Sequence, residues 1–293
     1  MESFLHDISW VVPLRSDVLT PVFRALTLLG YTEFFLVLLP LGFWLWDKAA
    51  FTRLAILIGF VGITNTFLKD VFQDPRPPVE FALDPRVGDS FGLPSGHAQI
   101  ATAMWLWLAY EIRRTWAWVA AIVIAIGVGA SRIYLGVHDM EDVLGGTLLG
   151  LASFVIYRGL VSDQFKAWHD LNPALQLAGI AALAPLLWFA WPRELPPSML
   201  ALVAFMLFWW LGKTVEQRWI RYERHANWAI AGAAAVVGIV GLFALMKVLG
   251  DQLLAAGLAK DLATIVPFAA SSLFVTAVAP ALFRLARAAR TAP

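Results

Sequence analysis

The segment Phe91-Gly-Leu-Pro-Ser-Gly-His97 joins a polar loop to an apolar stretch that predicts a helix over residues 98–112. Its Pro94, Ser95 and Gly96 predict a turn. A helix start carries unpaired N–H groups and a partial positive charge, so it can hold an anion. Ser95 is a favoured N-cap residue, and Gly96 lets the backbone approach a ligand closely. Taken alone, the segment is better explained as a capped helix start with an incidental histidine.

The composition around this segment is that of a membrane protein. Of the 293 residues, 60% are hydrophobic and 15% are charged, whereas a soluble domain is about 45–50% apolar and about 25% charged. The net charge of +1 argues against binding to nucleic acid or another polyanion. The absence of cysteine excludes disulfides and thiolate metal sites. The first ten residues lack the basic region of a cleaved signal peptide.

Apolar stretches of near-spanning length predict an all-α, polytopic transmembrane bundle. The nine expected spans are 31–46, 50–68, 98–112, 116–133, 143–160, 175–191, 198–211, 228–248 and 264–283. We expect an interfacial or re-entrant segment in residues 1–30, a six-helix core in 31–192, and about three additional spans in 193–293. A modest excess of Lys and Arg places the basic segment 213–224 in the cytoplasm. The protein is then a multi-pass protein of a bacterial cytoplasmic membrane, with the 91–97 turn on the extracytoplasmic face.

A second polar segment, Lys69-Asp-Val-Phe-Gln-Asp-Pro-Arg76-Pro77, follows the second expected span. Prolines on both sides stiffen the backbone at Arg76, and a rigid guanidinium suits bidentate contact with phosphate. Lys69 alone is more typical of an interfacial anchor. Arg86 in the following loop is expected to be solvated. The same is expected of four nearby acidic residues: Asp70, Asp74, Asp84 and Asp89.

A third segment, Ser131-Arg132-Ile-Tyr-Leu-Gly-Val-His138-Asp-Met-Glu-Asp142, connects two expected spans. The i,i+4 spacing puts His138 and Asp142 on one helix face, where the carboxylate can accept an imidazole N–H and fix the tautomer. The other ring nitrogen is then free to attack. Asp139 and Glu141 are expected to cap or solvate the helix start.

Together the three segments supply three cations, two histidines, a carboxylate and a helix N-terminus. Phosphoryl transfer needs charge around the phosphate oxygens, an in-line nucleophile and an acid for the leaving oxygen. All of these functions are available without a metal or another cofactor. The histidines outside these segments, including His6, are expected to be ordinary interfacial or loop residues.

The three segments resemble the type 2 phosphatidic acid phosphatase superfamily, which includes bacterial acid phosphatases and vanadium haloperoxidases. The matching residues are Lys69…Arg76-Pro77, Pro94-Ser95-Gly96-His97 and Ser131-Arg132…His138…Asp142. The resemblance implies that Lys69, Arg76 and Arg132 hold the phosphate, helped by the backbone N–H groups of Ser95 and Gly96. It also implies that His138 is the nucleophile and forms a phosphohistidine, that Asp142 orients it, and that His97 is the general acid and base.

Membrane members of that family act on lipids such as phosphatidic acid, phosphatidylglycerol phosphate, undecaprenyl diphosphate and sphingoid phosphates. The expected partners are therefore a lipid phosphate substrate and membrane lipids, and a homo-oligomer stays open. One alternative is a lipid phosphotransferase that uses the same site. Others are a haloperoxidase, a non-catalytic phospholipid transporter or scramblase, and a metal-dependent hydrolase with His97, His138 and Asp142 as ligands. The role of the C-terminal spans is not predicted.

Overall fold

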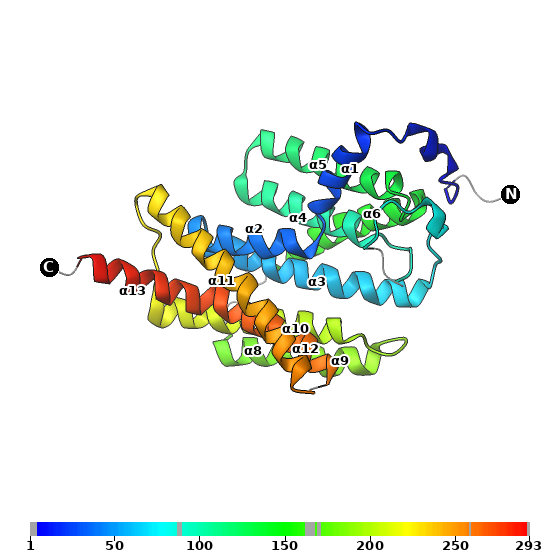
Figure 1. Ribbon diagram of the computed structural model, residues 1–293. Coiled ribbons are helices and arrows are strands. Elements are labelled where there is room, and N and C mark those ends of the chain that lie inside the picture. The colour runs from blue at the N-terminus through cyan, green and yellow to red at the C-terminus, as the bar shows by residue number, and fades with distance from the viewer. Residues whose placement is uncertain (1–4, 87–89, 162–167, 169–170, 258, 292–293) are drawn as a thin grey trace. The chain divides into compact units, whose positions relative to one another are not determined.

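The computed structural model describes residues 5–86, 90–161, 168, 171–257 and 259–291, and these contain helices and loops without strands (Figure 1). The α-helices are α1 (Leu19–Leu28), α2 (Thr32–Leu45), α3 (Lys48–Phe72), α4 (Gly96–Ile112), α5 (Thr115–Tyr134), α6 (Met140–Val161), α8 (Pro173–Ala181), α9 (Leu183–Ala190), α10 (Pro197–Val215), α11 (Trp228–Ala255), α12 (Lys260–Leu273) and α13 (Ala279–Thr291). Short 3₁₀ turns are η1 (Ser9–Leu14) and η2 (Val79–Phe81), and π-helical turns are η4 (Glu216–Ile220) and η5 (Phe274–Val278). The predicted all-helical class is confirmed.

Seven helical segments in the described residues are long and apolar enough to cross a membrane, and an eighth arises if α1 and α2 form one broken span bent by 55°. The prediction of nine was too high. The expected span 31–46 is only the second arm of that bent pair. Helix α4, expected to span, has 17 residues, which is the lower limit of length for a span. The three predicted C-terminal spans are present as 197–220, 228–255 and 260–287.

The chain folds as two compact units. Unit 1 comprises residues 1–35 and 60–165, and unit 2 comprises residues 36–59 and 166–293. Both units take in part of the long helix α3, so residues 36–59 group with the C-terminal half of the chain rather than with the expected 31–192 core. The division of roles between a phosphatase core and additional helices stays a prediction.

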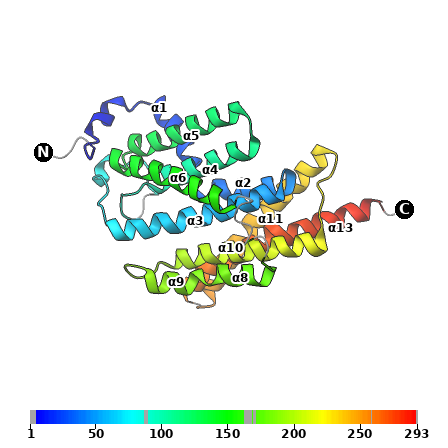
Figure 2. The same cartoon turned by 180° about the vertical axis from the view of Figure 1, so that it is seen from behind.

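In unit 1, α4 packs against both α5 and α6, and α1 packs on α5 (Figures 1 and 2). Glycines on α6 make the α4–α6 contact close. A Cβ atom on Gly146 would lie 2.4 Å from the carbonyl oxygen of Ser95, and one on Gly150 would lie 2.6 Å from that of Gln99. Only glycine allows two backbones to approach this closely. The turn before α4 is therefore seated directly on α6.

The N-terminal segment also belongs to the body of unit 1. Ile8, directly before η1, and Val11 of η1 are buried in a cluster with Leu135 and Val137, which lie between α5 and α6. The Arg15 guanidinium donates to the carbonyl oxygens of Tyr134 and Phe81. The segment thus holds the α5–α6 connection from outside, and that connection carries the third polar segment of the sequence.

In unit 2, α10 packs against α12 and α8, and α11 packs against α12. Buried polar groups there bond within the unit: the Trp44 indole donates to the Val275 carbonyl at 2.7 Å, and the Ser272 hydroxyl donates to the Phe205 carbonyl at 3.0 Å. Lys48 and the buried Glu216 form an ion pair at 2.5 Å. Unit 2 is an apolar bundle with a few well-paired polar groups.

Candidate active site

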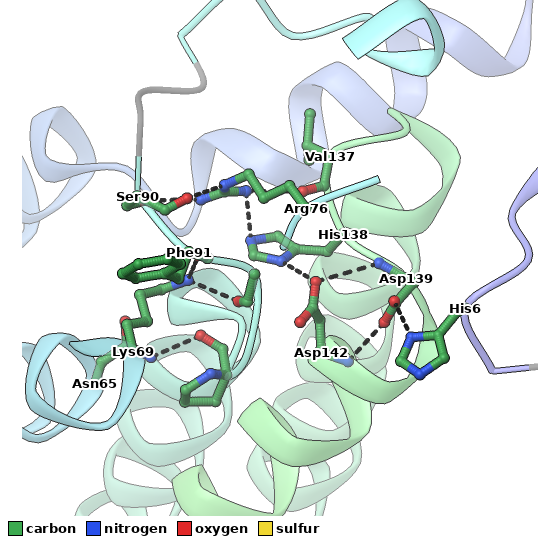
Figure 3. Close-up of polar contacts among 12 residues, drawn as sticks. His6, Asn65, Lys69, Arg76, Ser90, Phe91, Val137, His138, Asp139 and Asp142 are labelled. Carbon is green, nitrogen blue, oxygen red and sulfur yellow. Dashed lines mark hydrogen bonds and ion pairs between the residues drawn. The ribbon is translucent and has the colours of Figure 1, made fainter. Parts of the chain in front are cut away.

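His138 lies in the turn between α5 and α6, with a different partner on each side of its ring (Figure 3). Its Nδ1 is 2.7 Å from Oδ2 of Asp142, in the first turn of α6. Its Nε2 is 3.1 Å from Nη1 of Arg76, a nitrogen that can only donate. The imidazole is therefore held as the tautomer that donates from Nδ1 to Asp142 and exposes the Nε2 lone pair to a cation. Only 2% of His138 and none of Asp142 is exposed to solvent.

Arg76 is held rigidly, as the flanking prolines predict. It donates to the Val137 carbonyl at 2.7 Å, and to the carbonyl and hydroxyl oxygens of Ser90 at 2.6 and 2.8 Å. These bonds fix the guanidinium beside Nε2 of His138. An anion placed there would contact both groups, because Arg presents its donors in one plane.

Lys69, near the end of α3, is also directed into this region and is not an interfacial anchor. It is 7% exposed and donates to the backbone carbonyls of Phe91 and Gly92, the latter at 2.7 Å. The ammonium therefore lies against the start of the 91–97 segment. An ammonium has three donors, so these two contacts leave it capacity for a further acceptor.

Ser95 is placed differently from the prediction. It occupies the N-cap position of α4, but its hydroxyl makes no capping bond. Its backbone N–H donates to the Asp142 carbonyl at 2.9 Å and is not free for an anion. The buried Oγ has no hydrogen-bond partner in the described part of the chain, so the hydroxyl rather than the backbone N–H of Ser95 is available for a phosphate contact. Gly96 begins the helix, where the first N–H groups have no intrahelical acceptor.

His97 follows in the first turn of α4. Its Nε2 is buried and has no hydrogen-bond partner among the residues that the structure describes. Its ring meets the Tyr31 ring edge-on, with centroids 4.5 Å apart. A Cβ on Gly30 would lie 2.5 Å from the His97 ring, so the chain between α1 and α2 is pressed against it. These neighbours fix the direction of the imidazole.

Arg132, in the last turn of α5, is 3% exposed. Its Nη1 donates to the Thr27 hydroxyl at 2.5 Å and to Oδ2 of Asp84 at 3.2 Å, while its buried Nε has no partner. Asp84 also accepts from the Tyr31 hydroxyl. Sequence reasoning missed Tyr31 and expected Asp84 to be solvated. Tyr31, Asp84 and Arg132 lie far apart in the sequence, so no sequence spacing predicts the Arg132–Asp84 and Tyr31–Asp84 contacts. Only the structure shows them.

The predicted residues converge around His138. Burial lowers the pKa of His138 well below 6.5, and the positive charges of Arg76, Lys69 and Arg132 lower it further. His97 also lies close enough to His138 to interact with it electrostatically. A neutral imidazole keeps a lone pair on Nε2, which here faces the Arg76 guanidinium, and it is the form that can attack phosphorus. The site thus combines a neutral imidazole with several fixed cations.

A buried polar network connects α3 to the 91–97 turn and to α4. The Asn65 amide of α3 donates to the Pro94 carbonyl at 3.1 Å and to the Gln99 side chain at 2.9 Å. The amide of Gln99 in turn reaches the Thr64 hydroxyl at 3.3 Å. Such satisfied buried networks give a segment one defined position. Asn65 and Gln99 therefore position the turn without facing the His138 ring.

The N-terminal segment reaches the edge of the site through His6. Its Nδ1 is 2.8 Å from Oδ2 of Asp139 (Figure 3), and its Nε2 is 3.0 Å from Oε2 of Glu141. Asp139 also accepts the backbone N–H of Asp142 at 2.9 Å, which is the predicted cap of α6. His6, expected to be an ordinary interfacial residue, thus bonds to the cap of the helix that carries Asp142.

Metal ligation by His97, His138 and Asp142 has no geometric support in the described part of the chain, where no three His, Cys, Asp or Glu side chains gather in a metal-binding arrangement. Nδ1 of His138 already bonds to Asp142. The arrangement fits a phosphate surrounded by nitrogen donors.

Comparison with known proteins gives the same family over most of the chain. The PAP2 superfamily model matches residues 50–166, and the model "PAP2 superfamily phosphatase, transmembrane extension" matches residues 200–291. Phosphatidylglycerophosphatase B of Bacillus subtilis is 35% identical over 162 residues, which cover 50% of this chain and 78% of that protein.

Another sequence relative and a solved structure match the same half of the chain. Mouse sphingosine-1-phosphate phosphatase 2 is 32% identical over 155 residues, which cover 50% of this chain and 42% of that protein. The crystal structure of a transmembrane PAP2-type phosphatidylglycerolphosphate phosphatase from Bacillus subtilis aligns with 53% of this chain and 84% of its own, at 29% identity and a TM-score of 0.46. On the family models and the sequence relatives, the chain is an integral membrane phosphatase of the PAP2 superfamily.

Proposed function

We propose that this protein hydrolyses a lipid phosphate or diphosphate through a covalent phosphohistidine on His138, at the extracytoplasmic face of the membrane. The observation that carries the proposal is the pair of contacts on its ring, Nδ1 to Asp142 at 2.7 Å and Nε2 to Arg76 at 3.1 Å. This arrangement directs the nucleophilic lone pair at the place where a cation would hold phosphate.

In the first step, Nε2 of His138 attacks phosphorus, and the bond between phosphorus and the lipid oxygen breaks. His97 donates a proton to that oxygen as it leaves. Arg76, Lys69 and Arg132 stabilise the charge on the equatorial oxygens, together with the Ser95 hydroxyl and the Gly96 N–H group. Asp142 stabilises the positive charge that develops on the His138 ring.

In the second step, His97 accepts a proton from a water molecule, whose oxygen attacks phosphorus. The P–N bond breaks, inorganic phosphate leaves, and the lone pair returns to Nε2 of His138. The same cations stabilise this transition state, because the phosphoryl group stays in place. Replacing water with another lipid alcohol would instead give a phosphotransferase, so product analysis must accompany the assay.

The central experiment uses purified wild type, His138→Asn and His138→Ala in detergent. Wild type is expected to release phosphate from a panel of phosphatidic acid, phosphatidylglycerol phosphate, farnesyl diphosphate and sphingosine 1-phosphate. Brief reaction with a ³²P-labelled substrate should give an acid-labile, base-stable labelled protein in wild type and none in either variant. Activity in either variant close to that of wild type would refute the nucleophile assignment. A wild-type protein that releases no phosphate from any substrate would favour the transporter alternative.

The membrane face can be tested directly, because the natural chain has no cysteine. Single cysteines would replace Glu80, exposed in the loop before the 91–97 turn, and Arg218, exposed in the basic segment 213–224. In intact cells, an impermeant maleimide is expected to label Glu80→Cys and not Arg218→Cys. The opposite pattern would move the site to the cytoplasmic face.

A further inference from the structure

Arg86 is a fourth cation beside the site, outside the three segments that carry the family resemblance. Its guanidinium carbon lies 3.6 Å from the centre of the Tyr31 ring, and that ring makes a T-shaped contact with the His97 ring. The side chain of Arg86 is 45% exposed, whereas that of Arg132 is only 3% exposed. Arg86 is thus the more accessible of the two cations that border Tyr31.

Two contacts with Asp84 hold Arg86 in this position. The Arg86 backbone N–H donates to Oδ1 of Asp84 at 3.1 Å, and its Nε lies 3.6 Å from the same atom. Oδ2 of that carboxylate accepts from Arg132 and from the Tyr31 hydroxyl. One carboxylate therefore lies between two guanidinium groups, and the cluster keeps an excess positive charge.

The position of Arg86 relates it to His97 more than to His138. Arg86 lies close enough to His97 for their charges to interact, whereas the cations that act on His138 are Arg76, Lys69 and Arg132. In an in-line displacement the nucleophile and the leaving oxygen lie on opposite sides of phosphorus. If His138 attacks and His97 protonates the leaving oxygen, Arg86 borders the leaving group.

We propose that Arg86 is a specificity-determining residue that favours lipid substrates whose leaving group is an anion. This inference rests on the proposed function, because it needs His97 on the leaving side. The favoured class has two members. One is the lipid diphosphates, whose leaving group is a lipid monophosphate. The other is the phosphomonoesters attached to a phosphodiester lipid, whose leaving group keeps the charge of the phosphodiester. The leaving group of phosphatidic acid is a neutral alcohol, which gains no stabilisation from Arg86. The leaving group of a sphingoid phosphate is an amino alcohol, and Arg86 repels its ammonium group.

The test compares kcat/KM of wild type, Arg86→Gln and Arg86→Glu on three substrates in mixed micelles: farnesyl diphosphate, phosphatidic acid and sphingosine 1-phosphate. For Arg86→Gln we expect kcat/KM to fall about fivefold on the diphosphate, as for one partly exposed charge pair. Activity on phosphatidic acid should stay within about twofold, and activity on sphingosine 1-phosphate should rise. Charge reversal in Arg86→Glu should enlarge both changes.

Arg114→Gln is the matched control. Arg114 is an exposed arginine of the same unit, at the opposite end of α5 from Arg132. It should change none of the three values. The effect of Arg86→Gln on the diphosphate should also shrink at high salt, because screening weakens a partly exposed charge interaction.

The outcomes separate this inference from the proposed function. A wild-type protein that is inactive on all three substrates overturns the proposed function. Equal loss on all three substrates in the Arg86 variants, with wild type active, overturns the role of Arg86 and leaves the phosphatase assignment intact. A change in substrate ratio with the predicted sign, absent in Arg114→Gln, supports the specificity role.

Discussion

Each unit of this protein contains a buried carboxylate paired with a cation from a distant part of the chain. In unit 1, Asp84 pairs with Arg132 at 3.2 Å. In unit 2, Glu216 pairs with Lys48 at 2.5 Å. The two pairs look alike as ion pairs, yet their surroundings differ.

Around Glu216, polar groups are well satisfied. Its Oε1 also accepts the backbone N–H of Tyr222 at 2.8 Å, and Lys48 also donates to the Tyr222 carbonyl. Around Arg132, several are not. The buried side-chain atoms without a partner in the described residues all belong to unit 1, and four of them are Arg132 Nε, Ser95 Oγ, His97 Nε2 and Asp142 Oδ1.

The comparison shows how a structural ion pair differs from a site. Buried polar atoms without partners cost free energy, typically about 1–3 kcal/mol each. Three of them, Arg132 Nε, Ser95 Oγ and His97 Nε2, can donate a hydrogen bond, so a bound anion would supply their missing contacts, whereas Asp142 Oδ1 is an acceptor. The Lys48–Glu216 pair needs no such ligand and ties α3 to η4. The following predictions test this difference, from the largest expected effect to the smallest.

Replacing His97 with Gln should lower kcat/KM on lipid phosphates by about 10²–10⁴-fold, because both proton transfers lose their donor or acceptor. With p-nitrophenyl phosphate, the leaving group needs no proton, so the first step should recover while hydrolysis stays slow. Phosphoenzyme should then accumulate, measured as a burst of p-nitrophenol equal to the enzyme concentration. A uniformly slow reaction without a burst would contradict the role of His97.

Replacing Glu216 with Gln should destabilise the protein by about 2–3 kcal/mol, because Lys48 keeps its charge and loses its partner in a mostly buried place. The measurement is the unfolding midpoint in detergent. The kcat/KM per folded molecule should be unchanged. A large change in kcat/KM with no change in stability would contradict the structural role assigned to the Lys48–Glu216 pair.

Replacing Asp84 with Asn should also destabilise the protein, because Arg132 is buried and loses its carboxylate partner, but here we expect an additional effect on function. Without the carboxylate, Arg132 and Arg86 lose their common anchor, so KM should rise about tenfold and inhibition by inorganic phosphate should weaken. Glu80→Gln, an exposed change in the same loop, is the control. Asp84→Glu should restore part of the phosphate inhibition, a recovery that a purely structural defect would not show.

The pH profile tests the charge state of His138. Its lowered pKa means that the ring is neutral above that pKa, so the acidic limb of kcat/KM, where His138 becomes protonated, should lie below pH 6.5. In Arg76→Gln, loss of one cation should raise this pKa and move the acidic limb upward by less than about one pH unit. An acidic limb at the same pH in Arg76→Gln would show that the charge of Arg76 does not affect the pKa of His138.

The smallest effect is expected at His6, which is largely exposed. Its hydrogen bond and charge interactions with Asp139 raise the pKa of His6. The ion pair is therefore fully present below pH 6.5 and is lost as the pH rises through the raised value. His6→Ala should reduce stability by less than about 1 kcal/mol at pH 5.5 and by less at pH 8. Thermal unfolding at both values measures this difference.

Much of unit 1 follows from the sequence because its chemistry depends on local spacing. The i,i+4 relation of His138 and Asp142, the stiffened Arg76 and the helix start after Ser95 are short-range features. The contacts of Asp84 and Tyr31 could not be predicted, since they depend on how α1 and the 78–86 loop pack. Hydropathy found the apolar stretches but not their lengths as helices, so α4 and the second arm of the bent α1–α2 pair were each counted as a full span.

The backbone contact between α6 and the 91–97 turn limits how this enzyme can change. Because Gly146 and Gly150 leave no room for even a methyl group, a larger residue at either position would push α6 away from the start of α4, which carries His97. We therefore expect substitutions at the partly exposed Arg86 to be tolerated better than substitutions along this contact.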